Sequence, residues 1–209
     1  MANREVFTHQ LLITLEGLVR AHHSTYDEVP PQGIYFEHLV EKAFRLNRIP
    51  FTWVQPTTRN VPRHDLEVGD LRFSLKTETG EGTNPNFITI TKLLTTETGP
   101  WEPQALIGHA MRHLARYDYI LMLRAVWERP VIHYQVVDIP ITLLRLISGA
   151  ELGVVGRRAG RQSLGADIYR EGRKIVRVTF DGADGKCYIR KLPISECQLL
   201  RTWDLQIAG

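Results

Sequence analysis

The chain has 209 residues, of which 43% are hydrophobic and 23% charged, enough for one substantial domain with its own core. The formal net charge of +3 and a pI near 8.9 allow nucleic-acid binding without requiring it, because the distribution of basic residues matters more than their sum. A membrane span is excluded because the richest apolar run, YILML, is short and Arg124 follows it, and MANREVFTHQ lacks a signal-peptide core. Two cysteines without metal-ligand spacing, Cys187 and Cys197, predict a reduced, cytoplasmic protein.

In chain order, the pattern of apolar residues predicts helices at 9–23 and 33–46, a strand at 49–55 and a hairpin over 65–78. The rest predicts a strand at 87–94, a helix at 103–116, strands at 117–127 and 131–139, a short helix at 140–147, and a hairpin of 174–180 with 186–192. We therefore expect one α/β domain over 1–209, in which a central mixed β-sheet is flanked by helices.

The segment VPRHDLEVGDLRFSLKTETG, residues 61–80, combines an acid at Asp65, a tight turn at Gly69 and a strand that carries Lys76. The turn brings Asp65 opposite residues 72–74, so Asp65 and Lys76 can converge at one end of the hairpin. A lysine in an apolar strand is costly unless an anion meets it. Aspartate oxygens suit Mg²⁺, and an ammonium can stabilise charge that develops on a phosphate. The pair therefore predicts metal-dependent phosphodiester hydrolysis.

These residues resemble a known motif. The letters HD, ending in Asp65, followed by SLK, ending in Lys76, look like the PD-(D/E)xK nuclease motif. The upstream GIYFEHLVEKAF, with Gly33 and Glu37, resembles the helix that precedes this motif in many such nucleases. Over residues 33–92 the chain is similar to type II restriction endonucleases.

The resemblance implies a restriction-endonuclease-like fold and an enzyme of a restriction–modification system, which hydrolyses double-stranded DNA at specific sequences with Mg²⁺. It also implies that Asp65 and Glu37 bind the metal together with the backbone carbonyl of Leu75. Lys76 would then activate water or stabilise the transition state.

The sequence departs from the motif at its second acid, which is replaced by Ser74. Ser74 is itself a candidate catalytic residue. Serine cannot neutralise a divalent cation, so either the site holds one metal ion, or Glu37 or Glu78 supplies the missing charge. Glu78 lies about 7 Å further along the strand, so we favour Glu37. Asp70 is a rival to Asp65 as the first acid, but it lies in the turn itself.

Basic residues in four segments are predicted to contact DNA, since arginine binds phosphates and is favoured for contacts to guanine. Two lie beside the catalytic hairpin, two on the 103–116 helix, three in the Gly-rich segment 154–165, which we expect to be a flexible loop, and two in the last hairpin. They are Arg59, Arg63, Arg112, Arg116, Arg157, Arg158, Arg161, Arg177 and Arg190. Residues 150–195 are thus a candidate DNA-recognition loop and hairpin, although solvated charged surfaces fit the same residues.

Two other functions fit the sequence: a repair or recombination nuclease of the same fold, and a catalytically inactive DNA-binding module. Because a chain this small carries one Asp65/Lys76 pair, cutting both strands favours a C2 homodimer. Apolar faces available for that contact are on the first helix, at Leu12, Leu15 and Val19, and on the segment ITLLRLI, although core packing is the more common role of such faces.

Overall fold

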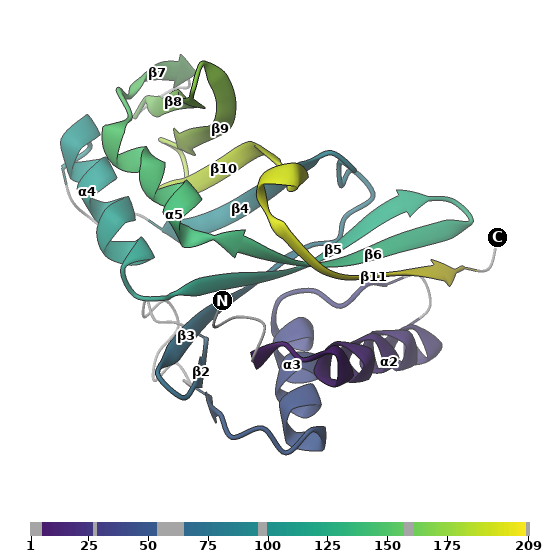
Figure 1. Ribbon diagram of the computed structural model, residues 1–209. Helices are drawn as coiled ribbons and strands as arrows, with labels where there is room; N and C mark the ends of the chain where they lie inside the picture. The colour runs from purple at the N-terminus through teal and green to yellow at the C-terminus, as the bar shows by residue number, and fades with distance from the viewer. Residues whose placement is uncertain (1–5, 27–28, 54–64, 96–99, 157–160, 208–209) are drawn as a thin grey trace. The chain divides into compact units, whose positions relative to one another are not determined.

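The computed structural model describes residues 6–26, 29–53, 65–95, 100–156 and 161–207. By their contacts these divide into two compact units, each treated by itself below. Unit 1 comprises Met1–Asn84, Tyr117–Ile139 and Cys197–Gly209, and unit 2 comprises Pro85–Arg116 and Pro140–Glu196. Each unit contains one β-sheet (Figure 1).

Unit 1 begins with two helices, α2 (His9–Thr25) and α3 (Ile34–Leu46), as the sequence predicts. Thr8 caps α2, because its hydroxyl accepts a hydrogen bond of 3.2 Å from the amide of Leu11. Helix α3 follows Gly33, whose φ of 48° suits a residue without a Cβ.

The sheet of unit 1 has six strands in the order β1-β2-β3-β5-β6-β11. Their bounds are β1 Thr52–Trp53, β2 Leu66–Val68, β3 Leu71–Glu78, β5 Tyr119–Glu128, β6 Val131–Pro140 and β11 Gln198–Gln206. Strands β3 and β5 pair in parallel, whereas β1 with β2, β2 with β3, and β6 with β11 pair antiparallel. The sheet is therefore mixed.

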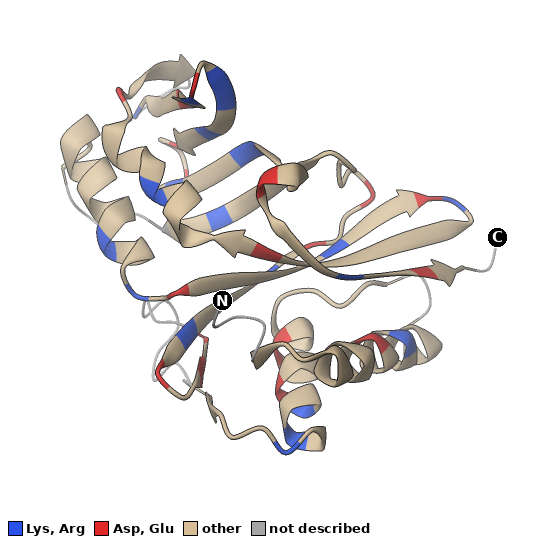
Figure 2. Ribbon diagram, viewed as in Figure 1, with Lys and Arg blue, Asp and Glu red and all other residues tan. Residues whose placement is uncertain are grey.

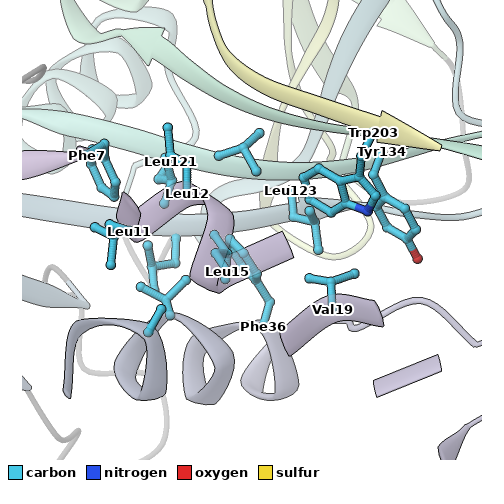
Figure 3. Close-up of a cluster of buried hydrophobic side chains, with 14 of the residues drawn as sticks. Phe7, Leu11, Leu12, Leu15, Val19, Phe36, Leu121, Leu123, Tyr134 and Trp203 are labelled. Atoms are coloured by element: carbon cyan, nitrogen blue, oxygen red, sulfur yellow. The ribbon is translucent and has the colours of Figure 1, made fainter. Parts of the chain in front are cut away.

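The core of unit 1 forms between the helices and one face of this sheet (Figure 3). Helix α2 contributes buried residues at helical spacing, and β3 contributes Phe73 and Leu75 from alternate positions. The two faces suggested above for a dimer contact are both buried. On the first helix, Leu12, Leu15 and Val19 belong to this core. In the segment ITLLRLI, the buried residues are Ile141, Leu143, Leu144 and Ile147. That part of the dimer prediction is wrong, because each face is covered within its own chain.

Arg124 on β5 is fully buried. Its Nε donates to Glu78 at 2.7 Å, its Nη1 to the side chain of Gln135 at 2.5 Å, and its Nη2 to the carbonyl of Asn84 at 2.6 Å. A buried cation requires a counter-charge and acceptors for its N–H groups, and these three partners supply both. Glu78 is thus committed to the interior of unit 1.

Unit 2 contains a five-stranded antiparallel sheet in the order β4-β10-β9-β8-β7. The strands are β4 Phe87–Thr95, β7 Gly153–Gly156, β8 Ser163–Arg170, β9 Arg173–Phe180 and β10 Lys186–Pro193. The helices α4 (Pro103–Leu114) and α5 (Ile141–Leu144) and the 3₁₀ turns η1 (Arg145–Gly149) and η2 (Ile194–Glu196) complete the unit. Figure 1 shows α4 and α5 on one side of this sheet.

The predicted α/β class, with helices flanking a mixed sheet, is confirmed, but the strands divide between two sheets. The expectation of a flexible loop over 154–165 is wrong in part, because residues 154–156 belong to β7 and residues 163–165 belong to β8. The expectation of one domain over the whole chain stays a prediction. None of the described helices is long and apolar enough to cross a membrane.

Removing the partner of a buried charge should be far more damaging than breaking an exposed pair. We expect Glu78→Ala to lower the free energy of unfolding by about 3–5 kcal/mol, because Arg124 would remain buried without its counter-ion. The matched control is Glu81→Ala, which breaks the exposed pair with Arg129 (2.9 Å) and should cost at most about 1 kcal/mol. Urea unfolding followed by circular dichroism measures both, and equal losses would contradict this assignment.

Candidate active site

The hairpin of β2 and β3 fixes Asp65 against the strand that carries Lys76. Leu66 pairs with Phe73 in this hairpin, and the amide of Asp65 donates to the carbonyl of Phe73 at 2.7 Å. The Oδ2 atom of Asp65 then accepts a 2.6 Å hydrogen bond from the amide of Leu75. The sequence prediction that Asp65 lies opposite residues 72–74 is confirmed by this register.

Ser74 also contacts Asp65. Its side chain is buried, and its hydroxyl donates to Oδ2 of Asp65 at 3.2 Å. Both described hydrogen bonds to this carboxylate thus go to one oxygen, and Oδ1 accepts none from the part of the chain that the structure describes. Ser74 therefore orients the acid, and Oδ1 has a lone pair to offer to a ligand.

Lys76 follows Leu75 on β3 and is half-buried. Its Nζ donates to the carbonyl of Leu75 at 3.3 Å, a long hydrogen bond. An ammonium and a main-chain carbonyl oxygen therefore lie together beside the carboxylate of Asp65.

Glu37 lies in the first turn of α3 and is also half-buried. The amide of Gly33, which precedes α3, donates to the hydroxyl of Thr77 at 3.3 Å, so the beginning of the helix is held against β3. Burial raises the pKa of Glu37, the negative charge of Asp65 raises it further, and the Lys76 ammonium opposes the rise. Because such effects fall with distance, Asp65, Glu37 and Lys76 form one electrostatic cluster.

The two rival acids lie elsewhere. Glu78 pairs with Arg124, and Asp70 lies exposed in the turn between β2 and β3. Within the described residues, no group of three or more His, Cys, Asp or Glu side chains could hold a metal ion. The cluster instead offers the two carboxylates of Asp65 and Glu37 and the carbonyl of Leu75. These are hard oxygen donors that suit a small divalent cation.

The predicted DNA-binding arginines have different surroundings. Arg112 is exposed on α4, and Arg116 follows that helix. The Arg161 guanidinium stacks 3.8 Å from the ring centre of Trp101, and its Nε donates to the carbonyl of Gly182. Arg177 and Arg190 are exposed at facing positions of β9 and β10. Four others lie outside the described residues: Arg59, Arg63, Arg157 and Arg158.

Sequence comparison decides the family. A family model described as type II site-specific deoxyribonuclease, SmaI, matches residues 3–205. The chain belongs to this SmaI family. A type II restriction enzyme SmaI from Serratia marcescens is 26% identical over 173 residues, which cover 81% of this chain and 69% of that enzyme. No solved structure matches the chain.

Membership of the SmaI family confirms the predicted type II restriction endonuclease, an enzyme that acts on double-stranded DNA. Enzymes of this kind generally use a divalent metal ion. Family membership supports the first of the three functions that the sequence allowed. The match extends beyond the hairpin of β2 and β3 to residue 205, whereas the motif resemblance covered only residues 33–92.

Substituting Asp65 or Lys76 should stop cleavage while leaving the fold intact. In Asp65→Asn the amide oxygen can still accept from Leu75, so we expect folding to survive and cleavage of plasmid DNA to fall by at least about 100-fold. Lys76→Gln should have a similar effect because it removes the ammonium. Gel-shift binding of DNA should persist in both variants.

Matched controls lie nearby. Asp70→Asn changes an exposed acid in the same hairpin, and Lys42→Gln changes an exposed lysine on α3. Both should cleave like the wild type. Near-normal cleavage by Asp65→Asn or Lys76→Gln would mean that the active site lies elsewhere.

Proposed function

We propose that this restriction endonuclease hydrolyses DNA with Mg²⁺ at the cluster of Asp65, Glu37 and Lys76. The observation that carries the proposal is the convergence of two carboxylates and an ammonium around β3, with one oxygen of Asp65 accepting no hydrogen bond from a described residue. In the reaction a water oxygen forms a bond to phosphorus and one P–O ester bond of the DNA backbone breaks.

Asp65, Glu37 and the Leu75 carbonyl would hold the ion. Burial and then the negative charge of Asp65 raise the pKa of Glu37, and a bound cation would offset both effects. Two acids and one carbonyl are few protein ligands, which suits Mg²⁺ because it retains several waters and prefers phosphate oxygens. When bound, Mg²⁺ would polarise the scissile phosphate and lower the pKa of a bound water.

The chain's own residues would orient the carboxylate of Asp65 and stabilise the charge that develops on the phosphate. Lys76 is a hydrogen-bond donor in the structure, so we assign its ammonium to the negative charge that develops on the phosphate oxygens. Ser74 keeps the carboxylate of Asp65 in one orientation through its hydroxyl. Because both groups are fixed by β3, little rearrangement is needed when DNA binds.

The remaining roles are also proposals. The nine arginines named from the sequence would supply DNA contacts. Arg161 would have to leave its stack on Trp101 to do so. We place the reaction in the cytoplasm, where Cys187 and Cys197, both free thiols in the structure, would stay reduced.

Incubation of the purified protein with phage DNA and Mg²⁺ tests the proposed function directly. A discrete set of fragments is expected, and its loss on chelation of the metal should be reversed by added Mg²⁺. A continuous smear would instead indicate cleavage without sequence specificity, and no cleavage would refute the proposal.

Glu37→Gln should raise the Mg²⁺ concentration needed for half-maximal cleavage by about tenfold or more, because one ligand charge is lost. The wild type should also require more Mg²⁺ as the pH falls, because protonated Glu37 cannot bind a cation. Its raised pKa moves this loss to a higher pH than for an ordinary glutamate. Glu37→Gln should show a weaker pH dependence. Metal titrations at several pH values measure both effects, with Glu41→Gln, one helical turn further along α3, as the control.

We propose a homodimer, because one cluster per chain must cut two strands. Light scattering of the protein with its DNA should give a protein mass of twice the 24.0 kDa of one chain. A protein mass of one chain, both free and with specific DNA, would rule the dimer out.

A further inference from the structure

One face of the five-stranded sheet in unit 2 carries a row of charged side chains. Residues such as Ile168, Val176, Val178 and Ile189 are buried and share one face of the sheet. The side chains between them project from the opposite face, because side chains alternate along a strand. Figure 2 shows basic positions on β9 and β10.

Three of these side chains lie in one line across neighbouring strands. Asp167 on β8 faces Arg177 on β9, and Arg177 faces Arg190 on β10. The guanidinium of Arg190 lies 5.1 Å from the ring centre of Tyr188 on the same strand. The row is basic overall, because Arg190 and Lys174 add positive charge beside the pair formed by Asp167 and Arg177.

Asp167 holds Arg177 along one edge of the guanidinium. Nε donates to Oδ1 at 2.6 Å and Nη2 donates to Oδ2 at 2.8 Å, while the Nζ of Lys174 lies 2.6 Å from Oδ2. The hydrogen bond from Arg177 holds the pKa of Asp167 well below its usual range, so the carboxylate is charged. Nη1 makes no hydrogen bond to any described residue, so the outer edge of the guanidinium, formed by Nη1 and Nη2, is open.

This geometry suits a base more than a phosphate. Guanine presents O6 and N7 in the major groove as a pair of acceptors, which match two parallel N–H donors of arginine. Asp167 offsets part of the positive charge that would attract a phosphate to this edge, and the cytosine paired with that guanine presents an amino group that a carboxylate accepts.

We propose that Arg177 recognises a guanine of the DNA target and that Asp167 is its positioning residue. The proposal rests on the proposed function, since it specifies how the substrate of that reaction is selected. Asp167 fixes the plane of the guanidinium before DNA binds, so less side-chain freedom is lost on recognition.

Cleavage of a pool of duplexes with randomised sequence, followed by sequencing of the cut ends, measures base preference at every position. We expect Arg177→Gln to reduce the preference for guanine at one position of each half-site by about tenfold to a hundredfold. Asp167→Asn should reduce preference at the same position and nowhere else. A purely structural ion pair would not produce a loss confined to one base.

Arg170→Gln is the matched control. Arg170 is also an exposed arginine of β8 paired with a carboxylate, that of Glu196 at 2.5 Å, and it lies at the end of the strand. This variant should retain every base preference of the wild type. Circular dichroism checks that all three variants are folded.

The outcomes separate this inference from the proposed function. If the wild type cuts a defined sequence and Arg177→Gln retains the same guanine preference at every position, the inference is wrong while the proposed function stands. A uniform loss of cleavage on all sequences would assign Arg177 to a phosphate and also overturn it. If the wild type does not cut, the proposed function fails. The base preferences of the wild type and Arg177→Gln are then compared on the duplexes that each protein binds from the same pool without metal. Absence of any selected sequence there would overturn the inference as well.

Discussion

The hydrogen bond from the amide of Leu75 to the carboxylate of Asp65 connects the fold of unit 1 to its chemistry. Strand β2 begins at Leu66, opposite Phe73, so the edge of β3 beyond that pair has no partner from β2. A buried amide without an acceptor is costly, and the side chain of Asp65 supplies the acceptor for the amide of Leu75. One oxygen of the acid thus binds the backbone of β3, and the other accepts no hydrogen bond from the described residues.

The same constraint fixes Lys76. Side chains alternate along β3, so a register shift by one residue would exchange Lys76 with Leu75, which is buried in the core of unit 1. The apolar contacts of Phe73 and Leu75 therefore hold the lysine on its side of the sheet. The positions of Asp65 and Lys76 follow from hydrophobic packing more than from attraction between their charges.

Local sequence patterns predict the hairpin that carries Asp65 and Lys76 and the first helix. Asp65 and Lys76 are close in the chain, and a hairpin turn fixes their register; the helical spacing from Leu11 to Val19 likewise predicts α2. Arg124 could not be assigned in this way, because its partner Glu78 is 46 residues away and becomes adjacent only when β3 and β5 pair in parallel. The sequence favoured Glu37 over Glu78 by distance along the strand, whereas the ion pair that holds Glu78 in the interior depends on that distant pairing.

Strand β8 was missed because the glycines and arginines before it indicated a loop, although Leu164, Ala166 and Ile168 alternate with polar residues as in a half-buried strand. The pair of Asp167 with Arg177 was missed with it.

Strands β1 and β2, with two and three residues, have a further consequence for the SmaI-family enzyme. Short strands at a sheet edge have few hydrogen bonds to break, so they open locally at a lower free energy than the helical core. Mild heating should therefore displace Asp65 and inactivate the enzyme before α2 and α3 melt, and such inactivation would reverse on cooling.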